Sequence, residues 1–317
     1  MGEIKGFPLC QRGPTLTDLL FADDSLLFCR ESGDECRKII DILEKYEGDL
    51  GQKVNKNKIT IFFSKSTMEA TKQEITAALG LQEFVHFEQY LGLPSLVGRR
   101  KKEGFNFIKE KVWKKLQGWE WKLLSQARRE VLIKAVIQAI PTYAMGCFKI
   151  PLGLCHEIET MIKKFWWGQR GEKRKIHWLT WEELTKSKLE GGMGFRDIAM
   201  FNDSLLAKQA WRILKILDSL LHKVFKARFF PNCTFMEAKH SSSGSHVWNS
   251  ILHGREVLLR GCQWRIRNGK VVSIWQDHWL PRKNMPQVQS PSVESLVDAK
   301  VEILIKEDTS DRRNFHP

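Results

Sequence analysis

The sequence has no run of apolar residues that approaches the roughly 18 needed to span a bilayer. Its first residues, MGEIKGFPLCQRG, have neither the apolar region of a signal peptide nor the Arg- and Ser-rich character of a transit peptide. Internal repeats and low-complexity tracts are absent as well. These absences argue against a membrane protein and a secreted one, so we expect an intracellular protein of the nucleus or cytoplasm.

The cysteines also lack a recognisable pattern. They include no CxxC pair, and the neighbouring Cys155 and His156 lack the second ligand pair of a zinc site. We predict that all seven are buried thiols that pack as small apolar side chains. They are Cys10, Cys29, Cys36, Cys147, Cys155, Cys233 and Cys262.

The composition is that of a globular protein. The chain has 317 residues, 42% of them hydrophobic, and a mean hydropathy of −0.34, which excludes disorder. The length suits one large domain or two ordinary ones.

Charge is distributed unevenly. Residues 1–50 carry 6 basic and 11 acidic side chains, whereas residues 99–175 carry 19 and 7. All 12 tryptophans lie between Trp113 and Trp279, which supports a boundary near residue 98. A surface this basic favours nucleic acid, because neutralising backbone phosphates releases counterions. Anionic membrane is the weaker alternative, since no segment is a clean basic amphipathic helix; a solvated charged face is the other.

The first third of the sequence alternates between strand and helix signals. Residues 16–30 place two apolar runs around a tight acidic turn, which predicts a hairpin. The further predictions are helices at 33–47 and 68–79, a buried strand at Ile59–Ser64, and an extended pair over Phe84–Leu93 bent at Gly92 and Pro94.

The rest of the chain is predicted to be mainly helical. One stripe contains Phe105, Ile108, Val112 and Leu116, and the apolar stretch Val131–Ile140 should end at Pro141. Further helices are predicted at 153–167, 178–187 and 200–229. Asn268 and Gly269 between β-prone arms predict a hairpin over 262–275, followed by an irregular tail beyond Pro281.

Paired carboxylates lie at the tip of the first hairpin. Asp23 and Asp24, held by apolar strands, suit binding of Mg²⁺, which prefers hard oxygen ligands. A solvated acidic turn is the alternative, since acidic pairs are ordinary turn residues.

The context of this turn resembles a known motif. FADD, flanked by Leu and Phe, is similar to the metal-binding motif of the reverse transcriptase palm. GQKVNKNK resembles the next palm motif, in which Lys58 would protonate the leaving pyrophosphate. EQYLGLP resembles the primer grip, with Tyr90, Leu91 and Gly92 in its core positions.

The resemblance continues in order through LVGRRKKEGFNFIKEKVWKKLQGW, LLSQARREVLIKAVIQAIPTYAM, FWWGQRGEKRKIHW, GGMGFRD and IWQDHWLP. The series resembles the non-LTR (LINE-type) retrotransposon reverse transcriptases of plants and covers nearly the whole chain. Trp121 and Arg128 stand where the family commonly has small residues, and Leu50 replaces a usual Ser.

The resemblance implies an α+β fold: a partial reverse-transcriptase palm, then a mainly α-helical thumb and connection region with a late β-hairpin. The implied parts are a palm over 1–98, a basic helical thumb over 99–165, a Trp-rich connection over 166–281 and an irregular tail over 282–317. The thumb would grip duplex template and primer through backbone phosphates. The residues expected at these phosphates are Arg99, Arg100, Lys101, Lys102, Lys109, Lys114 and Lys115.

In the family the reaction would be two-metal nucleotidyl transfer with Mg²⁺. Asp23 and Asp24 would be catalytic metal ligands, but a further carboxylate comes from upstream, and only 22 residues precede Asp23. Asp18 would point to the opposite face about 16 Å away, and Glu3 lies in an irregular stretch. The fingers and a ribonuclease H domain are missing too, so we predict no ribonuclease H activity.

Three interpretations of function are open at this point. The first is a truncated polymerase that retains two metal ligands but is inactive alone. Its partners would be an RNA template and a DNA primer or duplex, and it would bind dNTP only if the missing palm half is supplied. The second is a nucleic-acid-binding module that uses its basic thumb. The third is a pseudogene product whose unpaired strand edges reduce its solubility.

The aromatic residues and histidines have structural and functional interpretations. Trp113, Trp119 and Trp121 could stack on unpaired bases, although core packing is preferred for them. Core packing is also expected for Trp166, Trp167, Trp211, Trp275 and Trp279, and structural roles for His177, His246 and His278.

Overall fold

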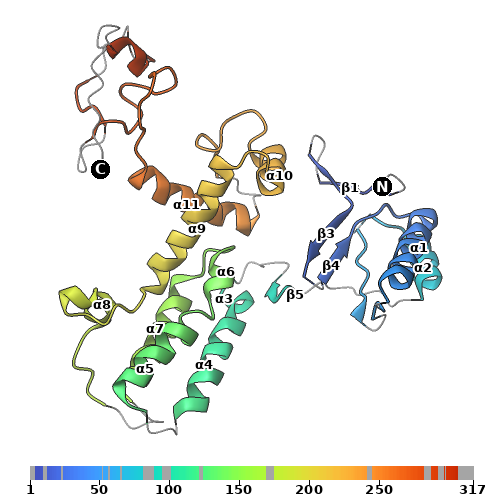
Figure 1. Ribbon diagram of the computed structural model, residues 1–317, viewed down its shortest axis with the longest axis horizontal. Coiled ribbons are helices and arrows are strands. Elements are labelled where there is room, and N and C mark those ends of the chain that lie inside the picture. Colours follow the sequence, from blue (N-terminus) through green and yellow to red (C-terminus); the bar gives the residue numbers. More distant parts are fainter. Residues whose placement is uncertain are drawn as a thin grey trace. The chain divides into compact units, whose positions relative to one another are not determined.

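The computed structural model divides into two compact units, residues 1–255 and 256–317. It describes residues 4–9, 13–22, 24–51, 53–55, 58–64, 66–80, 89–94, 101–120, 124–168, 175–240, 245–281, 287–291, 296 and 298–305. Among the described residues the strands lie before residue 101, and helices dominate from residue 101 to residue 261 (Figure 1). The described residues contain no helix of the length and apolar character required to cross a membrane.

The strands of the described residues form three antiparallel pairs of two strands each. They are β1 (Phe7–Pro8) with β2 (Thr15–Leu16), β3 (Asp18–Phe21) with β4 (Asp24–Leu27), and β5 (Gln89–Tyr90) with β6 (Leu93–Pro94). In the β3–β4 pair, Asp18 lies opposite Leu27 and Phe21 lies opposite Asp24. The hairpin predicted for residues 16–30 is therefore confirmed.

Two helices come after this hairpin and contact each other. Helix α1 (Gly33–Leu50) begins at Ser32, whose side chain accepts a hydrogen bond from the Glu35 N–H at 3.3 Å, and it ends at Gly51 in the left-handed region. Helix α2 (Glu69–Leu79) ends in the same way at Gly80. A serine cap before α1 and a left-handed glycine after each helix are standard boundary signals, and both predicted helices are confirmed.

The predicted buried strand at 59–64 is wrong. This segment contributes only a bridge residue, Ile61, and its side chains alternate between half-buried and exposed, with Phe62 60% exposed. A β-prone segment becomes a buried strand only when a neighbouring strand pairs with it and a layer covers it. The small two-stranded sheets of the described residues do not provide that surrounding.

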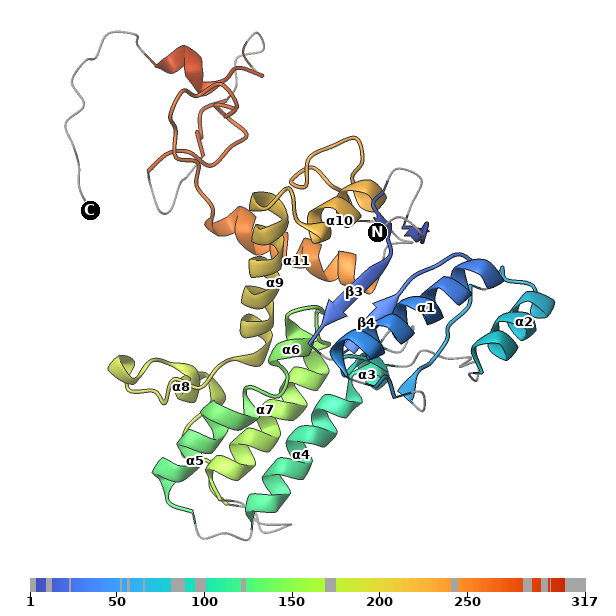
Figure 2. The ribbon, with the colours of Figure 1, turned by 45° about the vertical axis from the view of Figure 1, so that its right-hand side comes forward.

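The main core lies among the helices from residue 101 onward. The predicted stripe Phe105, Ile108, Val112 and Leu116 is confirmed as buried. Helix α4 (Asn106–Glu120) carries most of this stripe onto α7 (Leu152–Trp166), which also contacts α5 (Gln126–Leu132). Figure 2 shows these three helices in green, lying side by side. The other helices of this unit are α3 (Lys101–Gly104), α6 (Thr142–Met145), α8 (Trp181–Thr185), α9 (Ile198–Lys215), α10 (Leu220–Phe229) and α11 (His246–Gly261), which continues into the second unit.

The predicted apolar helix over 131–140 is not uniform. Helix α5 passes into a π-helical turn over Ile133–Ile137, in which the Gln138 N–H donates to the Ile133 carbonyl at 2.9 Å. The helix ends at Ile137, shortly before Pro141, and a separate helix, α6, begins directly after this proline. The apolar side chains of this stretch are not all buried, since Val131 is 63% exposed.

Two predicted helix boundaries need correction. The helix predicted over 200–229 is two helices, α9 and α10, because Ser219 starts a new helix by accepting a hydrogen bond from the His222 N–H at 3.2 Å. The helix predicted over 178–187 is the shorter α8, followed by a 3₁₀ turn at Lys188–Glu190. Helix α11 was not predicted from the sequence, because Gly254 in its middle has a low helix propensity and weakens the helical pattern.

Buried polar side chains join α9 to the segment that comes after α6. Asn202, fully buried, accepts a hydrogen bond from the Ile150 N–H at 2.8 Å and donates to the Met145 and Phe148 carbonyls at 2.8 and 2.9 Å. Glu159 on α7 is also buried and accepts from the Ile198 N–H at 3.0 Å, at the start of α9. These hydrogen bonds hold α9 against the segment after α6 and against α7.

In the second unit the late β-hairpin predicted over 262–275 is wrong. Gly269 does make the turn, at φ 68°, but the arms do not pair with each other. The Val301 N–H donates instead to the Val272 carbonyl at 2.8 Å, and the Ile274 N–H donates to the Ala299 carbonyl at 3.1 Å. The predicted irregular tail is therefore wrong for Val301–Leu304, a 3₁₀ helix whose Val301 enters a small core with Val272 and Ile274.

Candidate nucleic-acid interface

The acidic turn lies at the tip of the β3–β4 hairpin. Asp24 is exposed and begins β4, while Asp23 lies outside the described residues. Asp18 begins β3 at the far end of the ladder and accepts a hydrogen bond from the Thr17 hydroxyl at 2.7 Å. Asp18 and Asp24 therefore lie at opposite ends of the β3–β4 ladder.

The described residues do not complete a metal site. They contain no group of three or more His, Cys, Asp or Glu side chains placed to hold a metal ion. Asp24 is a hard oxygen donor of the type that Mg²⁺ prefers, but a two-metal centre needs several carboxylates. The described donors therefore do not fit the Mg²⁺ pair that the resemblance implies.

The other palm residues lie on separate elements. Lys58 is exposed in a short turn, where its N–H donates to the Asn55 carbonyl at 2.9 Å. Leu91 and Gly92 form the tight turn between β5 and β6, both at positive φ, 50° and 74°. Tyr90 ends β5. Within the described part of the chain no hydrogen bond or ion pair joins Lys58 or this turn to Asp24.

Two of the predicted phosphate-binding lysines have a structural partner instead. Glu157 on α7 pairs with Lys102 of α3 and with Lys109 of α4, the latter at 2.7 Å. Hydrogen bonds from these two lysines lower the pKa of Glu157 to about 2. Lys102 and Lys109 therefore connect α3 and α4 to α7, which reduces the positive charge that they offer to a ligand. Arg99 and Arg100 lie outside the described residues, and Lys101 is exposed at the start of α3.

Three other lysines form a row on α4, here called the basic strip: Lys111, Lys114 and Lys115. Side chains at spacings of three and four lie next to each other on a helix. All three are exposed, and none has an acidic partner among the described side chains. Lys111 lies over the Phe107 ring at 5.4 Å. Lys114 and Lys115 were predicted as contacts, whereas Lys111 was recognised only as part of the basic region.

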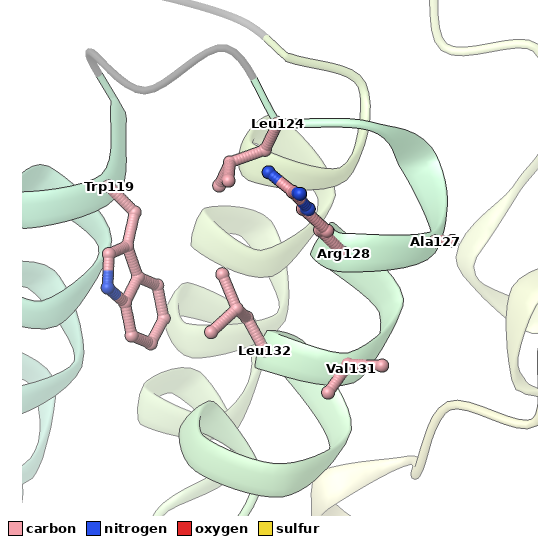
Figure 3. A pocket seen from close by; sticks show the side chains of 6 residues that line it. All are labelled: Trp119, Leu124, Ala127, Arg128, Val131 and Leu132. Carbon is pink, nitrogen blue, oxygen red and sulfur yellow. The ribbon is translucent and has the colours of Figure 1, made fainter.

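An open pocket lies at the end of the basic strip, where α4 and α5 both contact α7. Its volume is about 460 Å³, and its lining residues are Trp119, Leu124, Ala127, Arg128, Val131 and Leu132. Figure 3 shows the Trp119 indole facing α5, with Leu132 directed toward it and the Arg128 side chain extending toward Leu124. The sequence offered two signals for this pocket: Trp119 as a residue that could stack on bases, and the Arg at position 128 in place of a small residue.

The remaining tryptophans agree with the predictions in part. Trp166 is buried, whereas Trp113 and Trp211 are 53% and 43% exposed. The core packing preferred for Trp113 and predicted for Trp211 is therefore wrong; Trp211 lies exposed on α9 beneath Lys215. Trp121 lies outside the described residues. His246 is half-buried and stacks on Phe148 with ring centroids 5.8 Å apart, which agrees with a structural role.

The cysteines are less uniformly buried than predicted. Cys36 and Cys155 are buried, whereas Cys29, Cys147, Cys233 and Cys262 are half-buried, and all six are free. Cys10 lies outside the described residues. A hydrogen bond with Cys36, together with burial, raises the pKa of the Cys29 thiol.

Comparison with known proteins shows the relationship of the chain. It is 42% identical over 143 residues to an uncharacterized mitochondrial protein of Arabidopsis thaliana, and the match covers 45% of this chain and 93% of that protein. This chain belongs to the family of that mitochondrial protein. No protein-family profile matches it.

A longer relative of this family member carries a functional name. The chain is 30% identical over 203 residues to an Arabidopsis thaliana protein named "Putative ribonuclease H protein". That match covers 62% of the chain but only 32% of the relative, so the chain spans about a third of that protein's length.

Proposed function

We propose that this family member is a nucleic-acid-binding protein derived from the reverse transcriptase of a plant non-LTR retrotransposon. The ordered series of palm, primer-grip and thumb-like motifs supports the origin. A relative named as a ribonuclease H protein is consistent with it, because ribonuclease H enzymes act on RNA paired with DNA. The partners would be an RNA template and a DNA primer or their duplex.

The observation that carries the proposal is the basic strip. Lys111, Lys114 and Lys115 project from a helix whose opposite stripe is buried, so their positions are fixed by the core. Since their ammonium groups have no acidic partner among the described residues, phosphates can neutralise them without breaking an ion pair. Each phosphate that binds releases counterions, which gives an affinity that falls with salt.

The test is the salt dependence of binding to a labelled RNA–DNA hybrid, measured by fluorescence anisotropy. Changing the three strip lysines to alanine should weaken binding and lower the slope of log K against log salt by about 2.7, roughly 0.9 for each B-DNA-like phosphate contact. The control triple variant has the same net charge, and its lysines are also exposed: Lys208→Ala, Lys223→Ala and Lys239→Ala. Equal losses in both triple variants would refute a localised interface, and no binding by the wild-type chain would refute the function.

Nucleotidyl transfer is the second candidate, and the exposed Asp24 at the hairpin tip favours it. Since the described residues lack a complete carboxylate set, we expect no primer extension by this chain alone. The assay is extension on an RNA template with Mg²⁺ and dNTP, beside the variant Asp23→Ala/Asp24→Ala. Extension that disappears in the variant would show that the chain or a partner supplies the missing ligand.

A further inference from the structure

The pocket at the end of the basic strip has a fixed aromatic wall. Trp119 packs against the buried Phe165 of α7, with ring centroids 6.0 Å apart and planes inclined by 45°. The indole is only half-buried, so part of its surface remains open to a ligand. The volume of about 460 Å³ falls within the range of roughly 300–1,000 Å³ usual for small-molecule sites.

Two adjacent arginines at this pocket have different environments. Arg129 points inward, where its guanidinium donates to the Trp166 carbonyl at 3.1 Å and lies against Gly168. Arg128 is exposed and lines the pocket, without an acidic partner among the described residues. Arg129 is thus part of the framework, whereas the charge of Arg128 is available to a ligand.

The remaining lining is apolar and more exposed than a core would be. Val131 is 63% exposed, and Leu124 and Leu132 are half-buried. Lys115 lies one helical turn before Trp119 on the same side of α4. The site therefore combines an indole face and apolar side chains with the cation of Arg128, and Lys115 lies one turn away on α4. This combination suits a planar aromatic group attached to an anion.

We propose that this pocket binds one unpaired nucleobase of a bound nucleic acid, stacked on Trp119, with the adjoining phosphate at Arg128. The proposal rests on the nucleic-acid binding proposed above and identifies a site within it for an unpaired base. The basic strip holds the backbone of paired nucleic acid without reading the bases, and the pocket adds a preference for a base that has left the stack. Stacking of bases on aromatic side chains tolerates every base, because each has a π-face.

The experiment compares three RNA–DNA hybrids of equal length by fluorescence anisotropy: fully paired, with one bulged adenine, and with one bulged abasic residue. The abasic bulge keeps the flexibility of the backbone and removes the base. Wild type should bind the adenine bulge about fivefold or more tighter than the other two. The variant Trp119→Ala should bind all three equally.

Trp113→Ala is the matched control, since Trp113 is an exposed tryptophan of the same helix outside the pocket. It should keep the preference for the adenine bulge. Trp119→Leu keeps an apolar contact to Phe165 without an aromatic face, and provides the test if circular dichroism shows that Trp119→Ala fails to fold. Binding of all three hybrids without preference, or equal effects of the Trp113 and Trp119 variants, would overturn the pocket alone. No binding of any hybrid would overturn the proposed function and this inference together.

Discussion

Replacing Asn202 by alanine tests whether polar bonds fix the helical core. Its side chain is fully buried on α9 and makes three hydrogen bonds to backbone groups, those of Ile150, Met145 and Phe148. These groups lie at the end of α6 and in the segment between α6 and α7, where the Gly146, Cys147 and Phe148 N–H groups donate to carbonyls of α6 but the Ile150 N–H donates to Asn202. Asn202 therefore supplies backbone hydrogen bonds that a neighbouring strand or helix would otherwise supply to this segment.

The expected loss of stability depends on the groups that truncation leaves unpaired. The Ile150 N–H would be buried without an acceptor, and two carbonyls would each lose a donor. A buried group left unsatisfied costs about 1–3 kcal/mol. Carbonyls tolerate a lost donor better than an N–H tolerates a lost acceptor, so we expect Asn202→Ala to lower the free energy of unfolding by about 2–4 kcal/mol. In a domain of this size that corresponds to a Tm lower by roughly 5–15 °C.

Urea denaturation followed by circular dichroism measures this change. The matched control is Asn106→Ala on α4, where an exposed amide donates to Glu110 at 3.1 Å one turn away. That exposed pair should change stability by less than about 0.5 kcal/mol. If Asn202→Ala were as mild as its control, the three bonds would not hold the core together and the reasoning would fail.

Three further predictions rest on single residues. Gly254→Ala should destabilise the protein by about 1–3 kcal/mol, because the new Cβ would lie 2.3 Å from the backbone of Leu206. Gly118→Ala, with open space around it, should stabilise the protein by about 0.5–1 kcal/mol in the same urea assay. Two lysines lower the pKa of Glu157 to about 2. The ionised carboxylate therefore contributes to stability above its ordinary pKa of 4.5, and this contribution is lost as the pH falls toward 2. The urea midpoints of wild type and Glu157→Gln should differ at pH 7 and converge near pH 2. Burial raises the pKa of Cys155 to about 11, so iodoacetamide at pH 8 should label it only in urea, as read by peptide mass spectrometry; labelling in the native protein would contradict this.

Helices with a long apolar stripe and a clear cap were predictable from the sequence. Phe105, Ile108, Val112 and Leu116 recur at helical spacing, and all four are buried. Helix α1, predicted over 33–47, extends over Gly33–Leu50 and ends at Gly51, and Ser32 caps its start. In these cases the local preference and the tertiary environment agree, so the pattern alone is sufficient.

The errors occur where pairing partners are distant in the sequence. Val272 and Ile274 are β-prone and come after an Asn-Gly turn, but their backbone partners are Val301 and Ala299 rather than the preceding arm. Gly269 also approaches the backbone of Glu302 so closely that a Cβ would lie 2.4 Å from its nitrogen. A hairpin signal describes the turn; which segment pairs with the strand after it depends on tertiary contacts that no local window contains.

The candidate site could be predicted as a region but not as a set of side chains. The excess of basic residues over 99–175 directs attention to α4, yet the charges alone do not separate the lysines that pair with Glu157 from those without an acidic partner among the described residues. Lys109 was expected at phosphates and Lys111 was not singled out. The pocket was missed because it depends on Trp119 and Val131, which come from two different helices.

The distribution of acidic partners indicates where a polyanion can bind at the lowest cost. If Lys102 or Lys109 bound a phosphate, its ion pair with Glu157 would break. The contact of α3 or α4 with α7 would then be weaker. Neutralising Lys111 or Lys115 breaks no ion pair formed by the described residues, so the counterions released there contribute to affinity in full. If the chain binds nucleic acid as we propose, folding and binding use separate lysines of α3 and α4. Mutations in the two groups should then have separable effects: stability for the lysines that pair with Glu157 and affinity for those of the basic strip.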